Sequence, residues 1–291
     1  MKTMYDMMVM RDGTLVRIAR FEPETDLTGT PVSGVVQFVH GFGEHIGMYT
    51  DVARFFTSHG YALVVHDQRG HGSMPDKTPA KRAKALGVVP SYACFLSDIT
   101  AIRRQIAAWY PGLPVALAGL SMGGNIVANY AERLPDAPYA CVLIESPWLR
   151  LATPMPGIVT AFARIVGRLH PSLAISSRLD LDAVTRDPAQ LAAMKADPLY
   201  HDRISLKLYA QVLDAGAYAI EHAADITAPT LLLCGTGDRI VSVEAIHELA
   251  AHAGPNLTLH EFPGAYHCLH ADSNRQEVLD SMLAFVRTHA A

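Results

Sequence analysis

The sequence contains few cysteines and no strongly basic stretch. Its 291 residues include four cysteines that lie far apart, Cys94, Cys141, Cys234 and Cys268. This number and spacing exclude the disulfide framework of a small secreted domain and the paired cysteines of a structural zinc site. Lysine and arginine residues number 24 against 28 aspartate and glutamate residues, which gives a formal net charge of -4. Without an excess of positive charge, a nucleic acid is not expected as a partner.

Long apolar stretches are also missing, although half of the residues are hydrophobic. No window approaches the roughly 20 uncharged apolar residues that a membrane-spanning helix requires. Asp6 interrupts the apolar residues between Met1 and Met10, so a secretory signal does not form and we expect a cytoplasmic protein. A chain of this length can bury a large core, and it fits one α/β domain with an insertion better than two independent domains.

Short apolar runs and longer helix-like segments alternate along the chain. The runs are rich in β-branched residues and occur at 34–40, 61–66, 115–118, 139–144, 230–234 and 257–262. The segments of helical length lie at 49–59, 91–109, 125–133, 243–251 and 275–289. Runs that are apolar at nearly every position suit strands covered on both faces, so the order predicts a doubly wound, mostly parallel sheet. The alternating segment 13–21 predicts an antiparallel edge strand paired with the strand at 34–40.

Between Ser146 and Ala224 this alternation stops. Prolines, arginines and helical periodicity appear in the segment, and no convincing strand does. We therefore predict a helical cap at 146–224, inserted into a core that is formed by 1–145 and 225–291.

One segment of the predicted cap has the pattern of an amphipathic helix. Its apolar side chains fall on one face at helical spacing: Ile158, Val159, Phe162, Ile165, Val166 and Leu169. Arg164 and Arg168 fall together on another face. We expect this helix to pack on the core, with a lid that contacts a membrane surface as the alternative interpretation.

The stretch GLSMGG, residues 119–124, is typical of a nucleophile elbow, because it joins a short apolar run to a segment with helical periodicity. A serine on such a sharp turn needs neighbours without bulky side chains, and Gly119 and Gly123 meet that need. The turn would expose the Ser121 hydroxyl and leave the Met122 amide at a helix N-terminus, where it can donate to a developing oxyanion. The stretch indicates acyl transfer, whereas a plain glycine-rich turn is the alternative.

A serine nucleophile requires a histidine base and an acid that orients it. Asp238 follows the apolar run 230–234, and His267 follows the run 257–262, so both are expected at the carboxyl ends of strands. Their order after Ser121 is the order serine, acid, histidine that this kind of site requires. We therefore predict Ser121, Asp238 and His267 as the catalytic residues.

Other candidates fit less well. Asp67 precedes Ser121 and lies in the loop DQRGHG, whose charged residues we expect to pair with each other in a structural role. Glu145 follows the run at 139–144 and is the alternative acid. His270 lies close to His267 in the sequence, and we expect it to line or brace the pocket.

A second oxyanion donor is expected from the loop HGFGEH, residues 40–45, which follows an early strand. Its glycines allow the backbone to approach a substrate closely. The Phe42 amide would act with the Met122 amide, and losing one such donor typically costs about 3 kcal/mol of transition-state stabilisation. A glycine-rich turn without a donor role is the alternative.

Five motifs occur together, in the order HGFGEH, DQRGHG, GLSMGG, GTGDRIVS and GAYHCLH. With these motifs the chain resembles monoglyceride lipases and the related lysophospholipase-like, serine-aminopeptidase-type α/β-hydrolases over about residues 13–288. The resemblance implies an α/β-hydrolase fold, the catalytic residues Ser121, Asp238 and His267, and the oxyanion donors Phe42 and Met122.

The resemblance also implies that the cap shapes an acyl-binding tunnel and approaches membranes to collect lipid. Ile158, Phe162, Ile165 and His270 are the candidates for substrate binding. Two departures are visible. The position of Phe42 is small in many monoglyceride lipases, so its ring is expected to shorten or redirect the pocket. The loop also lacks the HGGPG form of proline iminopeptidases, which disfavours peptidase activity.

We therefore expect a serine carboxylic-ester hydrolase that requires no cofactor or metal and cleaves monoacylglycerol or a similar single-chain lipid ester. A lysophospholipase and a short-chain esterase are the nearest alternatives. A catalytically inactive ligand-binding module belongs to another class, and it is disfavoured because all three catalytic residues are present. Nucleotide binding is disfavoured because Ile240 occupies the last glycine position of the pattern that begins at Gly235.

Overall fold

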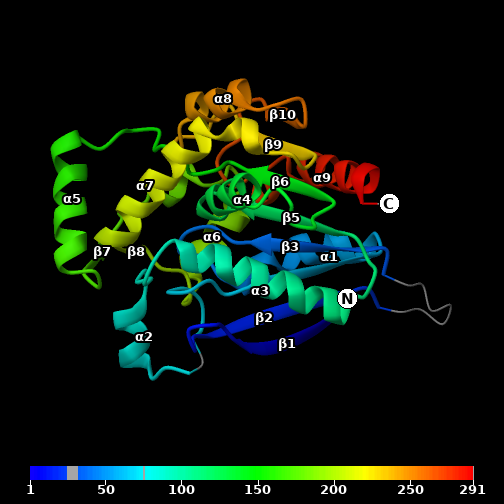
Figure 1. The fold of residues 1–291 in the computed structure, drawn as a ribbon, viewed down its shortest axis with the longest axis horizontal. Coiled ribbons are helices and arrows are strands. Elements are labelled where there is room, and N and C mark those ends of the chain that lie inside the picture. Colours follow the sequence, from blue (N-terminus) through cyan, green and yellow to red (C-terminus); the bar gives the residue numbers. More distant parts are fainter. Residues whose placement is uncertain (25–31, 75, 291) are drawn as a thin grey trace.

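The computed structural model describes residues 1–24, 32–74 and 76–290, and its centre is a twisted sheet of eight strands (Figure 1). The strands are β1 (Lys2–Val9), β2 (Leu15–Glu22), β3 (Gly34–Val39), β4 (Tyr61–His66), β5 (Val115–Leu120), β6 (Cys141–Glu145), β9 (Thr230–Gly235) and β10 (Leu257–Phe262). Their order across the sheet is β1-β2-β4-β3-β5-β6-β9-β10. The six strands from β4 to β10 run parallel, as their apolar sequences predict.

The antiparallel edge of the sheet differs from the sequence prediction. Segment 13–21 forms most of β2, which pairs with β4 rather than with β3 and is not the edge strand. The edge is β1, where Tyr5, Met7 and Val9 are exposed. The alternation of β2 correctly indicated an antiparallel strand, but it could not specify which of two similarly apolar strands, β3 or β4, would lie beside it.

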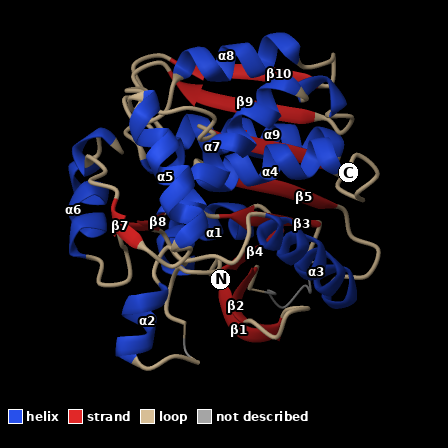
Figure 2. Ribbon diagram, turned by 60° about the vertical axis from the view of Figure 1, so that its left-hand side comes forward, coloured by secondary structure: helices blue, strands red, loops and turns tan. Residues whose placement is uncertain are grey.

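Helices cover both faces of the sheet (Figure 2). On one face lie α1 (Thr50–Ser58) and α9 (Arg275–His289), and on the other lie α3 (Ala93–Trp109), α4 (Met122–Arg133) and α8 (Val243–His252). The strands supply apolar side chains to both layers. For example, Leu231 and Leu233 join the cluster on the α1 side, whereas Leu232 joins the cluster on the α4 side. A further short helix, α2 (Pro79–Ala85), has no buried residue.

Between β6 and β9 the chain leaves the sheet and forms α5 (Gly157–Leu169), β7 (Ala174–Ser176), α6 (Pro188–Ala196), β8 (Arg203–Ser205) and α7 (Leu206–Glu221). The sequence indicated helices and no strand here, but β7 and β8 pair in a small antiparallel sheet. Each is three residues long, too short for an alternating pattern to be recognised. In Figure 1, α5 lies at the left of the view, and the C-terminus lies at the right.

The apolar face of α5 does not pack on the core as expected. Ile158, Phe162, Ile165 and Leu169 are 81%, 63%, 60% and 70% exposed. The helix instead contacts α7 through its small residues, of which Ala163 and Gly167 are buried. An added Cβ at Gly167 would lie 2.7 Å from the backbone nitrogen of Lys207, so the two helices approach as closely as glycine permits. In 1–24, 32–74 and 76–290, no helix combines the length and the apolar character needed to cross a bilayer.

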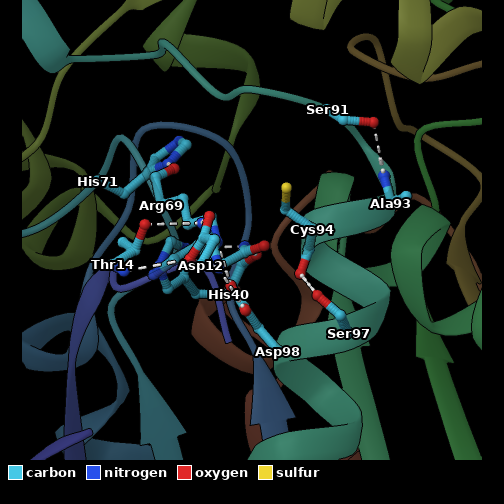
Figure 3. A network of polar contacts seen from close by, with 11 residues as sticks. Asp12, Thr14, His40, Arg69, His71, Ser91, Ala93, Cys94, Ser97 and Asp98 are labelled. Atoms are coloured by element: carbon cyan, nitrogen blue, oxygen red, sulfur yellow. Dashed lines mark hydrogen bonds and ion pairs between the residues drawn. The ribbon is translucent and has the colours of Figure 1, made fainter. Parts of the chain in front are cut away.

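The loop after β4 has a structural role, as predicted, although its charged residues do not pair with each other. Arg69 binds Asp98 on α3 through Nε at 2.5 Å and Nη2 at 2.8 Å, and it also binds Asp12 between β1 and β2 (Figure 3). Asp67 accepts hydrogen bonds from the Ile46 amide at 2.9 Å and the Ser73 amide at 3.3 Å. These contacts fasten the antiparallel edge of the sheet to the helical layer and to the loop after β3.

Candidate active site

Ser121 lies on a sharp turn between β5 and α4. Its backbone has φ 57° and ψ −116°, a left-handed conformation that costs an ordinary residue about 1–3 kcal/mol. The surrounding glycines permit the turn: a Cβ at Gly119 would lie 2.6 Å from the Gly123 oxygen, and one at Gly123 would lie 2.1 Å from the Val39 oxygen. The Ser121 amide donates to the Glu145 carbonyl oxygen at 2.9 Å. The sharp turn predicted from GLSMGG is therefore present.

Asp238 and His267 meet at the carboxyl ends of β9 and β10. The Nδ1 atom of His267 lies 2.7 Å from Oδ2 of Asp238. The other carboxylate oxygen of Asp238 accepts hydrogen bonds from the Ile240 and Val241 amides at 2.8 and 3.1 Å. Since the carboxylate can only accept, Nδ1 of His267 donates, and Nε2 is left free to accept a proton.

Electrostatics favour the protonated form of His267. Burial acts to lower the pKa of the imidazole, because it penalises the charged form. The charge and hydrogen bond of Asp238 act in the opposite direction, as do the charges of Glu44 and Glu145, and the net effect raises the pKa of His267 above 6.5. The histidine is therefore a stronger base than free imidazole, as a group that accepts a hydroxyl proton requires.

Two backbone amides beside Ser121 are available as donors. Met122 is the first residue of α4, so its amide has no partner within the helix. The Phe42 amide makes no hydrogen bond within the described part of the chain. Phe42 and Ser121 both line one cavity. Among the described residues, the two amides predicted as oxyanion donors thus have no competing partner.

Glu145 and His270 are neighbours, but neither contacts the Asp238–His267 pair through its side chain. The Oε2 atom of Glu145 lies 2.8 Å from Nδ1 of His270, and Oε1 accepts the His270 amide at 3.0 Å. Both side chains are buried, at 1% and 5% exposure. Glu145 is therefore paired with His270, and in this arrangement it does not act as the acid for His267.

Two groups of potential metal ligands occur in the described residues. Glu145, Cys268 and His270 bring their ligand atoms within 4.8 Å of one another, but hydrogen bonds within the group already occupy both glutamate oxygens and Nδ1 of the histidine. Cys234 lies beside the surface pair His247–Glu261, and burial raises the pKa of its thiol to about 12, which disfavours the thiolate that binds metals. Neither group has the chemistry of a ready metal site.

A cavity of about 490 Å³ opens between the sheet and the segment that connects β6 to β9. On the sheet side it is lined by Gly41, Phe42, Glu44, Ser121, Ile240 and His267. On the opposite side apolar residues predominate, including Leu151, Met155, Val159, Ala163, Ile175, Leu179, Val184, Met194, Ile204 and Leu206. The volume and the apolar lining suit a small ligand with a long hydrocarbon part.

The residues predicted to bind substrate are not on the wall of this cavity. Ile158, Phe162 and Ile165 point to solvent, and the helix faces the cavity with Val159 and Ala163 instead. The hydrophobic pattern identified an apolar face, but the position of α5 against α7 decided which side faces inward. His270 lies behind the cavity, with its ring 5.3 Å from the ring of Tyr49.

Phe42 is one of the residues that line the cavity. Its ring lies edge-on to the rings of His71 at 5.9 Å, His201 at 5.8 Å and Trp148 at 6.2 Å. Its orientation is therefore set by three aromatic neighbours.

Glu44 was not identified from the sequence as a site residue. It lines the cavity beside Ser121, although the residue is only 6% exposed. Its Oε2 atom accepts from the Gly41 amide at 2.7 Å and the Tyr49 hydroxyl at 2.6 Å, whereas Oε1 has no hydrogen bond with the described residues. The acidic residue in HGFGEH could have indicated this position in the sequence. A carboxylate in a glycine-rich loop can accept hydrogen bonds from the backbone amides of that loop and so stay beside the site.

The segment between β6 and β9 also makes hydrogen bonds to the loop that carries His267. The Cys268 amide donates to the Val184 carbonyl at 2.9 Å. Arg186 binds Asp272 through its backbone amide at 2.6 Å and its Nε at 2.8 Å. Residues on both sides of the cavity thus fix the position of His267.

A family model described as Hydrolase_4, serine aminopeptidase, S33, matches residues 30–274. The chain belongs to this family. Its fold, with a mostly parallel eight-stranded sheet, is the α/β-hydrolase fold.

Similar proteins include two that are named lipases. The monoacylglycerol lipase of Mycolicibacterium smegmatis is 31% identical, over 92% of this chain and 91% of that protein. The human monoglyceride lipase is 31% identical, over 84% of this chain and 78% of its own length. Among solved structures, the monoacylglycerol lipase of Paleococcus ferrophilus is 32% identical, with a TM-score of 0.82, and the match covers 94% of this chain and 99% of that chain.

Proposed function

We propose that the protein hydrolyses the ester bond of monoacylglycerols through an acyl-enzyme on Ser121. The observation on which this proposal rests is that Ser121 and the Asp238-paired His267 line one wall of an apolar cavity. The names of the relatives support a monoacylglycerol as substrate. The acyl chain would lie among the apolar residues, with its ester at Ser121.

In this mechanism Nε2 of His267 accepts the proton of the Ser121 hydroxyl as the oxygen attacks the ester carbonyl. Asp238 keeps Nδ1 protonated and stabilises the imidazolium that forms. The amides of Phe42 and Met122 would donate to the oxyanion of the tetrahedral intermediate. His267 then protonates the leaving glycerol oxygen, and afterwards activates the water that releases the fatty acid and restores Ser121.

Glu44 favours a neutral head group over a phosphate. Its carboxylate lies in the wall of the cavity beside Ser121 and accepts hydrogen bonds, so it suits a ligand that presents hydroxyl groups. The same negative charge would repel the phosphate of a lysophospholipid. Among the described residues, the cavity wall contains one lysine or arginine residue, Arg178, which follows β7 in the segment between β6 and β9.

We also propose that 146–224 is a cap over a core formed by 1–145 and 225–291, and that α5 contacts lipid surfaces. Several large apolar side chains around α5 are exposed: Met155, Ile158, Phe162, Ile165, Leu169, Leu173 and Ile175. Met155 and Ile175 also line the cavity, so this surface continues into the binding site. A helix that faces water with its apolar side is suited to lie in a membrane interface.

The deciding measurement is fatty-acid release from a monoacylglycerol and from a lysophosphatidylcholine of the same chain length, with Ser121→Ala as the blank. We expect turnover of the glyceride to exceed that of the phospholipid. Glu44→Gln should reduce this preference. A preference for the phospholipid would contradict the proposed head group, and cleavage of short soluble esters alone would indicate that Phe42 truncates the cavity and that the protein is a short-chain esterase.

A further inference from the structure

Glu145 makes hydrogen bonds both to the turn that carries Ser121 and to the loop that carries His267. Its backbone oxygen accepts the hydrogen bond of the Ser121 amide at 2.9 Å. Its side chain accepts both the amide and Nδ1 of His270, at 3.0 and 2.8 Å. Because His270 lies three residues after His267, Glu145 ties the turn of the nucleophile to the loop of the base.

The contact is a buried pair of charged groups. The Glu145 side chain is 1% exposed and that of His270 is 5% exposed. Burial acts to lower the pKa of His270, but the charge of Glu145 and its hydrogen bond act in the opposite direction, and the net effect raises this pKa above its ordinary value. The Glu145 carboxylate therefore favours the protonated form of His270, and that form compensates a carboxylate that would otherwise stand alone in the interior.

Two aromatic rings and a thiol lie against the His270 ring. The rings of Phe38 on β3 and Tyr49 lie 5.8 and 5.3 Å from the His270 ring, and Cys268 Sγ lies 3.6 Å from its Nε2. The Tyr49 hydroxyl donates to Glu44 at 2.6 Å. Burial raises the pKa of both Tyr49 and Cys268, so these two groups stay neutral.

Three carboxylates therefore raise the pKa of His267. Asp238 holds it directly, and the charges of Glu44 and Glu145 act from a greater distance. The cation of His270 offsets one of these negative charges. Removing either member of the buried pair would thus change the electrostatic field at the base as well as the position of its loop.

We propose that the Glu145–His270 pair is a positioning device for the reaction, which holds the loop of His267 against the turn of Ser121 and balances the charge behind the base. Neither residue lines the cavity in the described structure, so neither is expected to touch substrate. The inference rests on the proposed serine chemistry at this site, but it does not depend on which ester is cleaved.

The test measures the rate at which a fluorophosphonate labels Ser121, as a function of pH, in the full chain. Labelling requires an activated serine but not the natural substrate. We expect Glu145→Gln and His270→Gln to slow labelling at the optimal pH by about 10²-fold, the loss typical of a misplaced catalytic group. With the best ester, kcat should fall in parallel and KM should stay unchanged.

The pH profiles separate positioning from a general loss of structure. Glu145→Gln removes a negative charge and should move the acid limb of the profile to lower pH, by about half a unit or more. His270→Gln leaves the Glu145 charge uncompensated and should move the limb to higher pH by a similar amount. Glu145→Asp keeps the charge but shortens the side chain, so it should slow labelling without moving the limb.

Circular dichroism must show that each variant is folded at the assay temperature. If the glutamine variants do not fold, Glu145→Asp is the variant to measure, because it is the mildest change. Glu248→Gln is the matched control, because Glu248 belongs to an exposed ion pair with Arg150 and should leave rate and profile unchanged. The proposal is wrong if folded variants label at the wild-type rate, or if both glutamine variants move the limb in the same direction or not at all. If the wild type labels but cleaves no monoacylglycerol, the proposed substrate fails and this inference stands.

Discussion

In the serine turn on the sheet side of the cavity, the backbone leaves no room for one more carbon atom, whereas in the segment between β6 and β9 the same change can meet open space. A Cβ at Gly123 would lie 2.1 Å from the Val39 oxygen, but one at Gly157, at the start of α5, has nothing within 4 Å. The exposure of the side chains also differs between the two sides. Asp238 and Glu145 are buried and fully paired, whereas the apolar side chains of α5 face water.

The difference follows from what each side does in the proposed reaction. Proton transfer between Ser121 and His267 requires a geometry that is fixed to within a fraction of an ångström, and buried hydrogen bonds and close backbone contacts provide it. Binding a flexible hydrocarbon chain requires apolar surface, but no particular direction for each contact. Four predictions test this comparison, beginning with the largest expected effect.

Ser121→Ala should abolish ester hydrolysis, with kcat lower by about four orders of magnitude or more, because no other group forms the acyl-enzyme. Fatty-acid release measures the loss, and a fluorophosphonate probe should label the wild type only. Equal labelling of the two proteins would refute the assignment of the nucleophile.

Gly123→Ala should destabilise the protein by about 3 kcal/mol and remove most of its activity, because the new carbon would collide with the backbone at the end of β3. Gly157→Ala makes the same chemical change at the start of α5, and we expect it to leave the activity unchanged and the free energy of unfolding within about 0.5 kcal/mol of the wild type. Urea unfolding of the two variants measures the contrast. Equal losses would show that the two sides of the cavity are constrained alike.

The activity should fall in acid with a midpoint above pH 6.5. His267 must be neutral to accept a proton, and its pKa is raised, so a larger fraction is protonated and inactive at pH 6.5 than for an ordinary histidine. The profile of kcat/KM against pH measures this midpoint. His247→Gln, in an exposed pair with Glu261, is the control and should not move it. A midpoint below 6.5 would contradict the electrostatic description of the base.

Phe162→Ser combined with Ile165→Ser should weaken binding to neutral lipid vesicles by about 10-fold, because two exposed apolar side chains are lost from the proposed membrane surface. Hydrolysis of a short soluble ester should not change. Arg168→Gln, on the polar face of the same helix, is the matched control. Vesicle binding that is unchanged in the double variant would show that α5 is only a scaffold for the cavity.

Much of the fold could be predicted from local pattern. The segments 61–66 and 230–234 lie in β4 and β9, and 275–289 is α9, because buried parallel strands and amphipathic helices each have a characteristic periodicity. The pattern did not reveal β1. An edge strand has one neighbour and one exposed face, so its sequence resembles that of an irregular surface segment.

The sequence by itself determined the serine turn and the order of Ser121, Asp238 and His267, because a strained turn restricts its glycines and the residues after strand ends must converge at one edge of the sheet. Tertiary structure decided the pairing of β2 with β4, the side of α5 that faces the cavity, the place of Glu44 in the wall and the contact of Glu145 with His270. These depend on which surfaces meet after the chain has folded. A one-dimensional pattern records the chemistry of each surface, but it does not record which surface lies opposite.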